Sequence, residues 1–186
     1  RENLDLPRYY AYRSIVEGIH HYDIGNGKNY FYYHNPETGK WATLPWDLDL
    51  TWADNMYGPG TEPFQHRVAE VDPFEGEYHN KLREVMDLLY NPEQTGLLVD
   101  EKASAVYTPG KPSLVDADRA MWDHNPIMSS KYVNSSKSGE GRYYRIAKTD
   151  DFPGMMQILK NYVVKRSTWM ESRVLDSTDS KIPNAP

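Results

Sequence analysis

The spacing of apolar residues predicts a mainly helical chain. Apolar positions recur at helical intervals over Pro153–Leu175, the longest such run, and again over Leu4–His21. Pro7 suits the first turn of this second helix, since the N–H that proline lacks needs no partner there. Gly18 weakens a helix relative to alanine, so we expect it to mark close packing. Similar patterns predict three further helices, at Glu77–Tyr90, Pro92–Val106 and Ser113–Trp122.

One stretch departs from the helical pattern and predicts a β-hairpin. Asn29–Tyr33 and Lys40–Pro45 are short and rich in aromatic or β-branched residues, and the turn sequence Pro36–Gly39 separates them. The loop ahead of the hairpin, Tyr22–Lys28, contains glycines that permit left-handed backbone. After the hairpin, Leu50–Phe74 lacks a sustained period, which predicts a long irregular loop of the kind that often carries function.

The length of the chain predicts one domain with a core of its own. We place this domain at residues 1–176 and a linker or tail at residues 177–186, where two prolines occur without an apolar period. Asp123–Asp151 is polar and rich in serine and glycine, so we expect an exposed connection there. Because the chain does not begin with Met, we expect it to be processed or to be part of a longer protein.

Composition and charge exclude several function classes. The formal net charge of −6 repels the phosphates of nucleic acids, so we expect no nucleic-acid partner. No run approaches the roughly 18 apolar residues that a membrane span needs, so we expect no span. The absence of cysteine excludes disulfides, thiolate catalysis and cysteine-ligated zinc.

Asp23 and Asn29 are the first candidate functional residues. An aspartate in a loop after a helix can orient a hydroxyl nucleophile and accept its proton, although a single aspartate there more often bonds its own turn. The amide oxygen of Asn29 can bind a hard cation such as Mg²⁺, which prefers oxygen ligands. Asn29 can equally serve only to start the strand, so neither residue alone decides the function.

Asp47 and Asp49 form the stronger pair. They follow the second predicted strand and are flanked by Trp46 and Trp52. If the extended conformation continued, residues two apart would project from the same face, where two carboxylates repel unless a cation lies between them. The alternative is two solvated acids. We favour a metal-binding role for at least one of the two.

The order of these motifs resembles a known family. Over His21–Trp52 the sequence contains an Asp, then Asn-Tyr, Gly-Lys-Trp and Pro-Trp-Asp-x-Asp. This set is similar to the core of the spore-coat protein H (CotH) kinase family, an atypical branch of the protein-kinase-like fold found in spore coats and in secreted or cell-envelope proteins. The similarity continues more loosely to about Leu175.

The resemblance implies a fold and a reaction. The fold would be α+β and mainly helical, the C-terminal lobe of a protein kinase with a β-hairpin at the catalytic loop. Asp23 would match the catalytic acid, Asn29 and Asp47 would match metal ligands, and Asp49 would be a second acid of the metal set. The reaction would transfer phosphate from ATP, with Mg²⁺ or Mn²⁺, to a Ser or Thr hydroxyl of a protein substrate. The location would be extracellular, in the cell envelope or in a spore coat.

The sequence also departs from a complete kinase. A kinase needs a Gly-rich loop and a strand lysine in an N-terminal lobe, and nothing ahead of the first predicted helix supplies them. Lys28 and Lys40 lie in other places, and Thr51 begins the segment where many family members carry a glycine. We therefore expect either that the N-terminal lobe is a missing segment of the same protein or that activity is lost.

Two other functions fit parts of the sequence. Asp47, Asp49 and Thr51 match the DxDxT start of the haloacid-dehalogenase phosphohydrolases, in which the first aspartate is the nucleophile. That fold needs an apolar run before the first aspartate and alternating strands and helices after it, which this sequence lacks. The other alternative is a non-catalytic module, either a pseudokinase used for surface binding or a Ca²⁺-dependent carbohydrate site.

Overall fold

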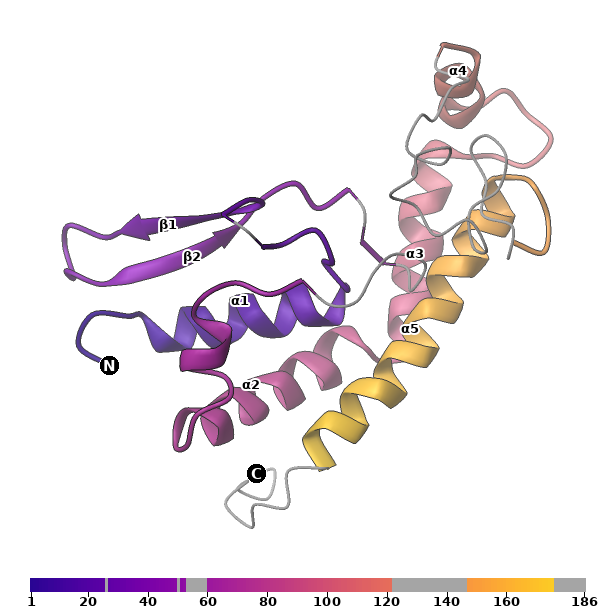
Figure 1. The fold of residues 1–186 in the computed structure, drawn as a ribbon. Coiled ribbons are helices and arrows are strands. Elements are labelled where there is room, and N and C mark those ends of the chain that lie inside the picture. Colours follow the sequence, from indigo (N-terminus) through magenta and orange to yellow (C-terminus); the bar gives the residue numbers. More distant parts are fainter. Residues whose placement is uncertain (26, 50, 53–59, 122–146, 176–186) are drawn as a thin grey trace. The chain divides into compact units, whose positions relative to one another are not determined.

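The computed structural model describes residues 1–25, 27–49, 51–52, 60–121 and 147–175. Its elements in chain order are α1 (Leu6–Gly18), β1 (Tyr30–His34), β2 (Trp41–Pro45), the 3-10 helix η1 (Gln65–Arg67), α2 (Phe74–Leu89), α3 (Pro92–Val106), α4 (Leu114–Met121) and α5 (Phe152–Leu175) (Figure 1). Among the described residues, those up to Tyr90 and from Lys165 onward form one compact unit, and those from Asn91 to Val164 form another. The described chain is mainly helical with one small sheet, so the α+β prediction is confirmed at that level.

Helix α1 is the central element of the first unit. The side chain of Asp5 accepts a hydrogen bond from the backbone N–H of Arg8 (3.3 Å), and Pro7 occupies the first turn as predicted. The helix ends at Gly18, where an added Cβ would lie 2.5 Å from the hydroxyl oxygen of Tyr90. The prediction that Gly18 marks close packing is therefore confirmed.

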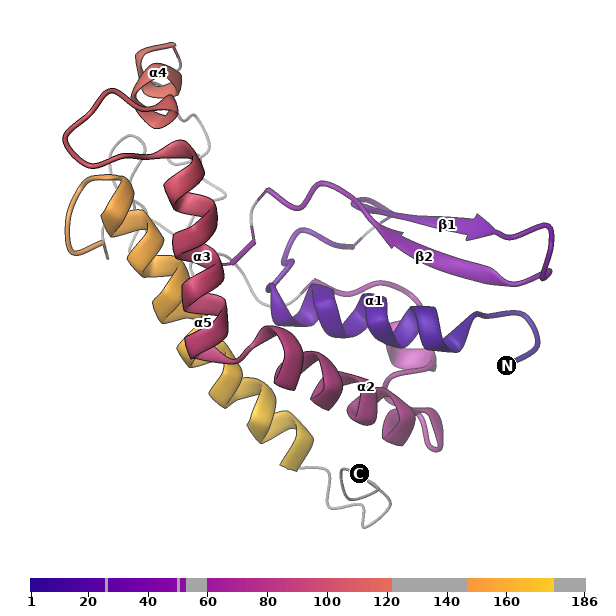
Figure 2. The same cartoon turned by 180° about the vertical axis from the view of Figure 1, so that it is seen from behind.

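The two strands form an antiparallel hairpin in which Tyr30 pairs with Pro45 and His34 pairs with Trp41. Each strand starts one residue later than predicted. The backbone N–H and C=O of Trp41 also bond to the segment just before α1, at 2.8 and 2.9 Å, which ties β2 to the start of that helix. Helix α1 lies between the hairpin on one side and α2 on the other (Figure 2).

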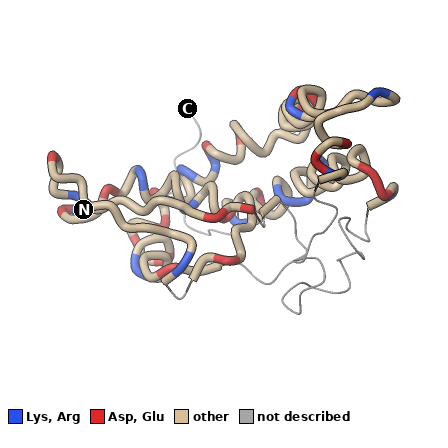
Figure 3. The backbone as a smooth tube through the Cα atoms, turned by 90° about the horizontal axis from the view of Figure 1, so that it is seen from above, with Lys and Arg blue, Asp and Glu red and all other residues tan. Residues whose placement is uncertain are grey.

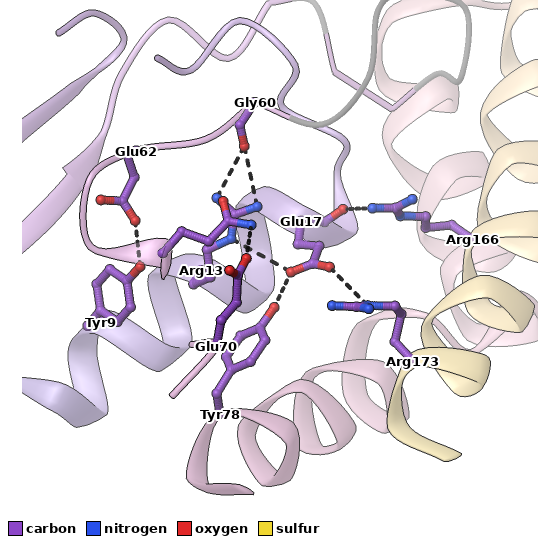
Figure 4. Close-up of polar contacts among 10 residues, drawn as sticks. Tyr9, Arg13, Glu17, Gly60, Glu62, Glu70, Tyr78, Arg166 and Arg173 are labelled. Carbon is purple, nitrogen blue, oxygen red and sulfur yellow. Dashed lines mark hydrogen bonds and ion pairs between the residues drawn. The ribbon is translucent and has the colours of Figure 1, made fainter. Parts of the chain in front are cut away.

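A buried network of charged and polar side chains joins three helices of this unit (Figure 4). Glu17 of α1 lies 3.7 Å from the Nε atoms of both Arg13 and Arg173. Its carboxylate also accepts a hydrogen bond from Tyr78 of α2, and its backbone oxygen accepts one from Arg166 of α5. Burial and the adjacent carboxylate raise the pKa of Tyr78, so its hydroxyl stays protonated and donates.

The second unit begins with two capped helices. The side-chain oxygen of Asn91 accepts hydrogen bonds from the first two backbone amides after Pro92, at 3.1 and 3.2 Å. Ser113 and Asp116 bond reciprocally at the start of α4, since each side chain accepts from the other's backbone N–H (3.4 and 3.0 Å). The predicted cap at Ser113 is confirmed. Trp122, the predicted end of this helix, lies outside the described residues.

Some predicted boundaries differ from the structure. Helix α1 is shorter than the predicted Leu4–His21. Helix α2 begins at Phe74, ahead of the predicted Glu77, because acidic residues in the first turn of α2 interact favourably with the helix dipole. The predicted loop Leu50–Phe74 contains η1 in its described part. The predicted tail at 177–186 and most of the predicted connection at 123–151 lie outside the described residues, and the domain boundary at residue 176 stays a prediction.

Acidic and basic residues are interspersed along the described elements (Figure 3). Over the same residues, no helix combines the length and the apolar character that crossing a membrane demands.

Candidate active site

The structure brings Asp23 and Asn29 into direct contact. The side-chain nitrogen of Asn29 donates to the backbone oxygen and to the carboxylate Oδ2 of Asp23, both at 2.9 Å. Asn29 has a φ of 63°, in the left-handed region that asparagine tolerates better than most residues. Its amide nitrogen is thus committed to Asp23, while its amide oxygen accepts no hydrogen bond from the described residues.

Lys28 occupies the other oxygen of the same carboxylate. Its Nζ lies 2.6 Å from Asp23 Oδ1, and its side chain is 58% exposed against 32% for Asp23. An ion pair this accessible adds little to stability, but it partly neutralises Asp23. Sequence reasoning missed this contact. The available signal was Gly25, which lets the loop fold back so that its backbone pairs with that of Lys28.

Asp47 and Asp49 do not share a strand face. Strand β2 ends at Pro45, and Asp47 has a φ of 57°, so the alternation of an extended chain does not reach it. The expectation that both carboxylates project from one face required a continued strand, and the structure does not meet that condition. Both residues are exposed, and Asp49 has no hydrogen bond to Asp23 or Asn29 within the described residues.

His21 and Trp46 connect Asp47 to the Asp23 loop. The backbone N–H of Trp46 donates to the backbone oxygen of Asn29 (3.1 Å), and the buried imidazole of His21 donates from Nε2 to the backbone oxygen of Trp46 (3.1 Å). Burial lowers the pKa of His21, and the nearby carboxylates of Asp23 and Asp47 oppose that shift. His21 thus links the start of the Asp23 loop to the residue ahead of Asp47 through a backbone carbonyl.

The oxygen donors at this site suit a hard cation. The amide oxygen of Asn29 and the exposed carboxylate of Asp47 are ligand types that Mg²⁺ accepts alongside water and phosphate oxygens. In the part of the chain that the structure describes, no three His, Asp or Glu side chains gather into a ready-made metal site. The residues present fit a metal that takes few protein ligands.

Comparison with known proteins decides the family. The model of a family described as CotH kinase protein matches residues 1–170. The chain belongs to this family. A curated relative, the inner spore coat protein H of Bacillus subtilis (strain 168), is 24% identical over 149 residues, which cover 72% of this chain and 40% of the relative. The chain thus spans about 40% of the length of that relative, and the resemblance seen in the motifs is confirmed.

The family match covers all four candidate residues, Asp23, Asn29, Asp47 and Asp49, and their individual roles stay predictions. The DxDxT alternative gains no support from the fold. The described strands form one antiparallel hairpin, not the alternation of strands and helices that a haloacid dehalogenase requires.

Proposed function

We propose that this CotH family chain is the catalytic-loop part of an atypical protein kinase. The reaction is transfer of the terminal phosphate of ATP to a Ser or Thr hydroxyl of a protein, with Mg²⁺ or Mn²⁺. The observation that carries the proposal is a set of hydrogen bonds around Asp23. The side chain of Asn29 donates to the Asp23 carboxylate. Trp46, the residue before Asp47, bonds through its backbone to Asn29 and to the imidazole of His21.

Asp23 acts on the substrate hydroxyl in this proposal. Its carboxylate orients the hydroxyl and accepts its proton while the hydroxyl oxygen bonds to phosphorus and the bond from phosphorus to the departing ADP oxygen breaks. Asn29 keeps the carboxylate in one orientation through Oδ2, so a single rotamer faces the substrate. Lys28 limits the build-up of negative charge where a phosphate must approach.

Asn29 and Asp47 are the residues that would hold the metal ion, with Asp49 as a second acid close in sequence. When bound, the ion would offset the negative charge of the phosphates. The left-handed backbone at both Asn29 and Asp47 directs each residue away from its strand, so each donor lies in a loop at one end of the hairpin.

The remaining parts of the nucleotide site belong, in this proposal, to an N-terminal segment of the same protein. The described residues include no Gly-rich loop followed by a strand lysine of the kind that covers ATP in kinases. The Bacillus relative is named as a spore coat protein, which supports a protein substrate in a spore coat or cell envelope or outside the cell.

A second candidate is a pseudokinase that serves as a binding module. The observation that favours it is the Lys28–Asp23 contact at 2.6 Å, because Lys28 occupies an oxygen that a substrate hydroxyl would use. Catalysis requires that the substrate displace Lys28 or share the carboxylate with it.

Calorimetric titration with Mg²⁺-ATP and transfer of labelled phosphate to Ser/Thr peptides separate these functions. Both are measured on this chain and on a version extended at its N-terminus. In the extended protein, Asp23→Asn and Asp47→Asn are each expected to lower transfer by at least about 100-fold, since each removes a group that acts in the transfer step. Asp87→Asn, on the exposed surface of α2, is the control and is expected to retain full activity.

The outcomes are distinct. Failure of the extended protein to bind Mg²⁺-ATP would contradict the kinase proposal, while binding without transfer would identify a pseudokinase. An unchanged rate in Asp23→Asn or Asp47→Asn would remove that residue from the site.

A further inference from the structure

A segment without regular structure, residues 60–64, packs against the loop that carries Asp23 and buries two of its own residues, Gly60 and Glu62. A Cβ added to Gly60 would lie 2.7 Å from the backbone oxygens of His21 and Ile24 and 2.8 Å from the backbone nitrogen of Ile24. Such separations are far below the roughly 3.5 Å at which non-bonded heavy atoms pack best. Gly60 therefore touches the loop backbone on both sides of Asp23, and an alanine cannot replace it without moving that backbone.

A second backbone contact lies next to the first. Gly25 has a φ of 141°, and a Cβ there would lie 3.1 Å from the backbone oxygen of Thr61. Two successive residues of the segment thus meet the Asp23 loop through main-chain atoms. Main-chain contacts cannot adjust by a change of rotamer, so they transmit any displacement of the segment directly to the loop.

Arg13 of α1 fixes one end of the segment. Its Nη1 and Nη2 both donate to the backbone oxygen of Gly60, at 3.3 and 3.4 Å, and its side chain is only 2% exposed (Figure 4). The guanidinium is itself held by Glu17, one turn along the same helix. The fork of Arg13 thus places Gly60 relative to the helix that precedes the catalytic loop.

Glu62 fixes the middle of the segment. This residue is 2% exposed, and its carboxylate accepts hydrogen bonds from the hydroxyl of Tyr9 (2.5 Å), the backbone N–H of Phe64 (2.7 Å) and the hydroxyl of Tyr32 (3.4 Å). Burial and the Glu62 charge raise the pKa of Tyr9, so its hydroxyl remains a donor. Helix α1 and strand β1 thereby both hold the segment in place.

We propose that residues 60–64 form a buttress segment that positions Asp23, with Gly60, Arg13 and Glu62 as its positioning residues. The inference rests on the proposed kinase function, because it assigns these residues an effect on the transfer step. A catalytic group that moves by about 1 Å can lose about 100-fold in rate. The buttress segment limits such movement through contacts with the loop on both sides of Asp23.

The test is Gly60→Ala in the N-terminally extended protein. We expect kcat for phosphate transfer to fall by about 10- to 100-fold, while the KM for ATP stays within about twofold, because the variant shifts the acid while the groups proposed to cover ATP belong to the N-terminal segment. Gly76→Ala is the matched control, since no described atom other than those of its chain neighbours and its own helix backbone lies within 4 Å of its added Cβ. Arg13→Lys, which keeps the charge but loses the fork, is expected to show a smaller fall in kcat of the same kind.

A readout on this chain alone separates the inference from the proposed function. We expect amide NMR shifts at residues 21–25 to change in Gly60→Ala and to stay constant in Gly76→Ala. Unchanged shifts, or a Gly60→Ala enzyme as active as the control, would overturn the positioning role. A third outcome separates the two proposals: the amide shifts change in Gly60→Ala, but neither the extended parent nor its variants transfer phosphate. The kinase proposal then fails, while the contact between Gly60 and the Asp23 loop is supported.

Should Gly60→Ala not fold, Glu62→Gln replaces it, since the side chain keeps its size and loses only its charge. A kcat-selective loss is again the expected result, and an unchanged kcat would contradict the role of the buttress segment.

Discussion

At the scale of single residues, the candidate site depends on backbone conformations that few side chains tolerate. Asn29 and Asp47 have φ values of 63° and 57°. Left-handed backbone brings Cβ close to the following carbonyl oxygen, and short polar residues such as Asn and Asp accept it more readily than others. Both proposed metal ligands are thus suited to their positions by conformation as well as by chemistry.

Asn29→Ala tests the left-handed conformation. We expect it to lower the free energy of unfolding by about 1–2 kcal/mol, because alanine keeps the left-handed Cβ but loses the hydrogen bonds to Asp23 and the local polar bonding that lets asparagine accept this backbone. Asn29→Gly loses the same hydrogen bonds but accepts the backbone, so we expect a smaller loss. Urea unfolding measures both variants, and equal losses would contradict the left-handed geometry.

At the scale of elements, one close contact sets how α1 meets the end of α2. Gly18 closes α1, and the ring of Tyr90, which follows α2 directly, lies where its Cβ would be. Tyr90 also stacks on Trp52, with 6.0 Å between ring centroids. Because Gly18 has no side chain, the ring of Tyr90 can pack against both the end of α1 and Trp52, which follows the hairpin.

Gly18→Ala and Gly76→Ala are expected to change stability in opposite directions. Alanine favours a helix over glycine by about 1 kcal/mol, and Gly76 has open space around its Cβ, so Gly76→Ala should stabilise. Gly18→Ala meets the buried Tyr90 ring and should destabilise by about 1–3 kcal/mol through overpacking. Urea midpoints measure the pair, and a stabilised Gly18→Ala protein would contradict the tight contact.

At the scale of the whole molecule, buried charge links residues far apart in the chain. Glu17 contacts Arg13, Tyr78 and Arg173, which belong to three different helices. Charges removed from water are costly unless they are paired, so each partner depends on the others.

Glu17→Gln removes the negative charge and leaves Arg13 buried without its counter-ion. We expect a loss of about 3–5 kcal/mol in the free energy of unfolding, as for other broken buried pairs. The control is Glu77→Gln, which breaks the solvent-accessible pair with Arg1, keeps an acceptor for the Tyr10 hydroxyl and should cost much less. Similar losses in the two variants, measured by urea unfolding, would show that the Glu17 network adds no more than a surface pair.

Two buried histidines predict how stability depends on pH. Burial lowers the pKa of both His21 and His79 below the ordinary value of 6.5. Below about pH 6.5 the unfolded chain binds more protons than the folded one, so the free energy of unfolding should fall as the pH drops towards the lowered folded-state values. His79→Leu should reduce this slope between pH 7.5 and 5.5 in urea unfolding. An unchanged slope would remove His79 from the effect.

The sequence predicted the elements whose signals are local. The bounds of α3 match because two adjacent residues mark its start: Asn91 caps the helix and Pro92 occupies its first turn. The hairpin was predictable because its turn residues lie between two aromatic strands. The candidate residues were found for the same reason, since the acids and the amide lie within one short stretch in the order typical of the CotH family.

The family, the helical content, the hairpin and the candidate acids could all be predicted before the fold was known, because each depends on residues close together in the chain. Three features became visible only in the folded chain: the contact of Lys28 with Asp23, the left-handed backbone at Asp47, and the close approach of Gly60 to the Asp23 loop. Arg13 and Gly60 are 47 residues apart, and Arg166 and Glu17 are 149 apart. Hydrophobic periodicity reports which face of an element is buried and carries no information on the partner that buries it, so such contacts become visible only when the chain is folded.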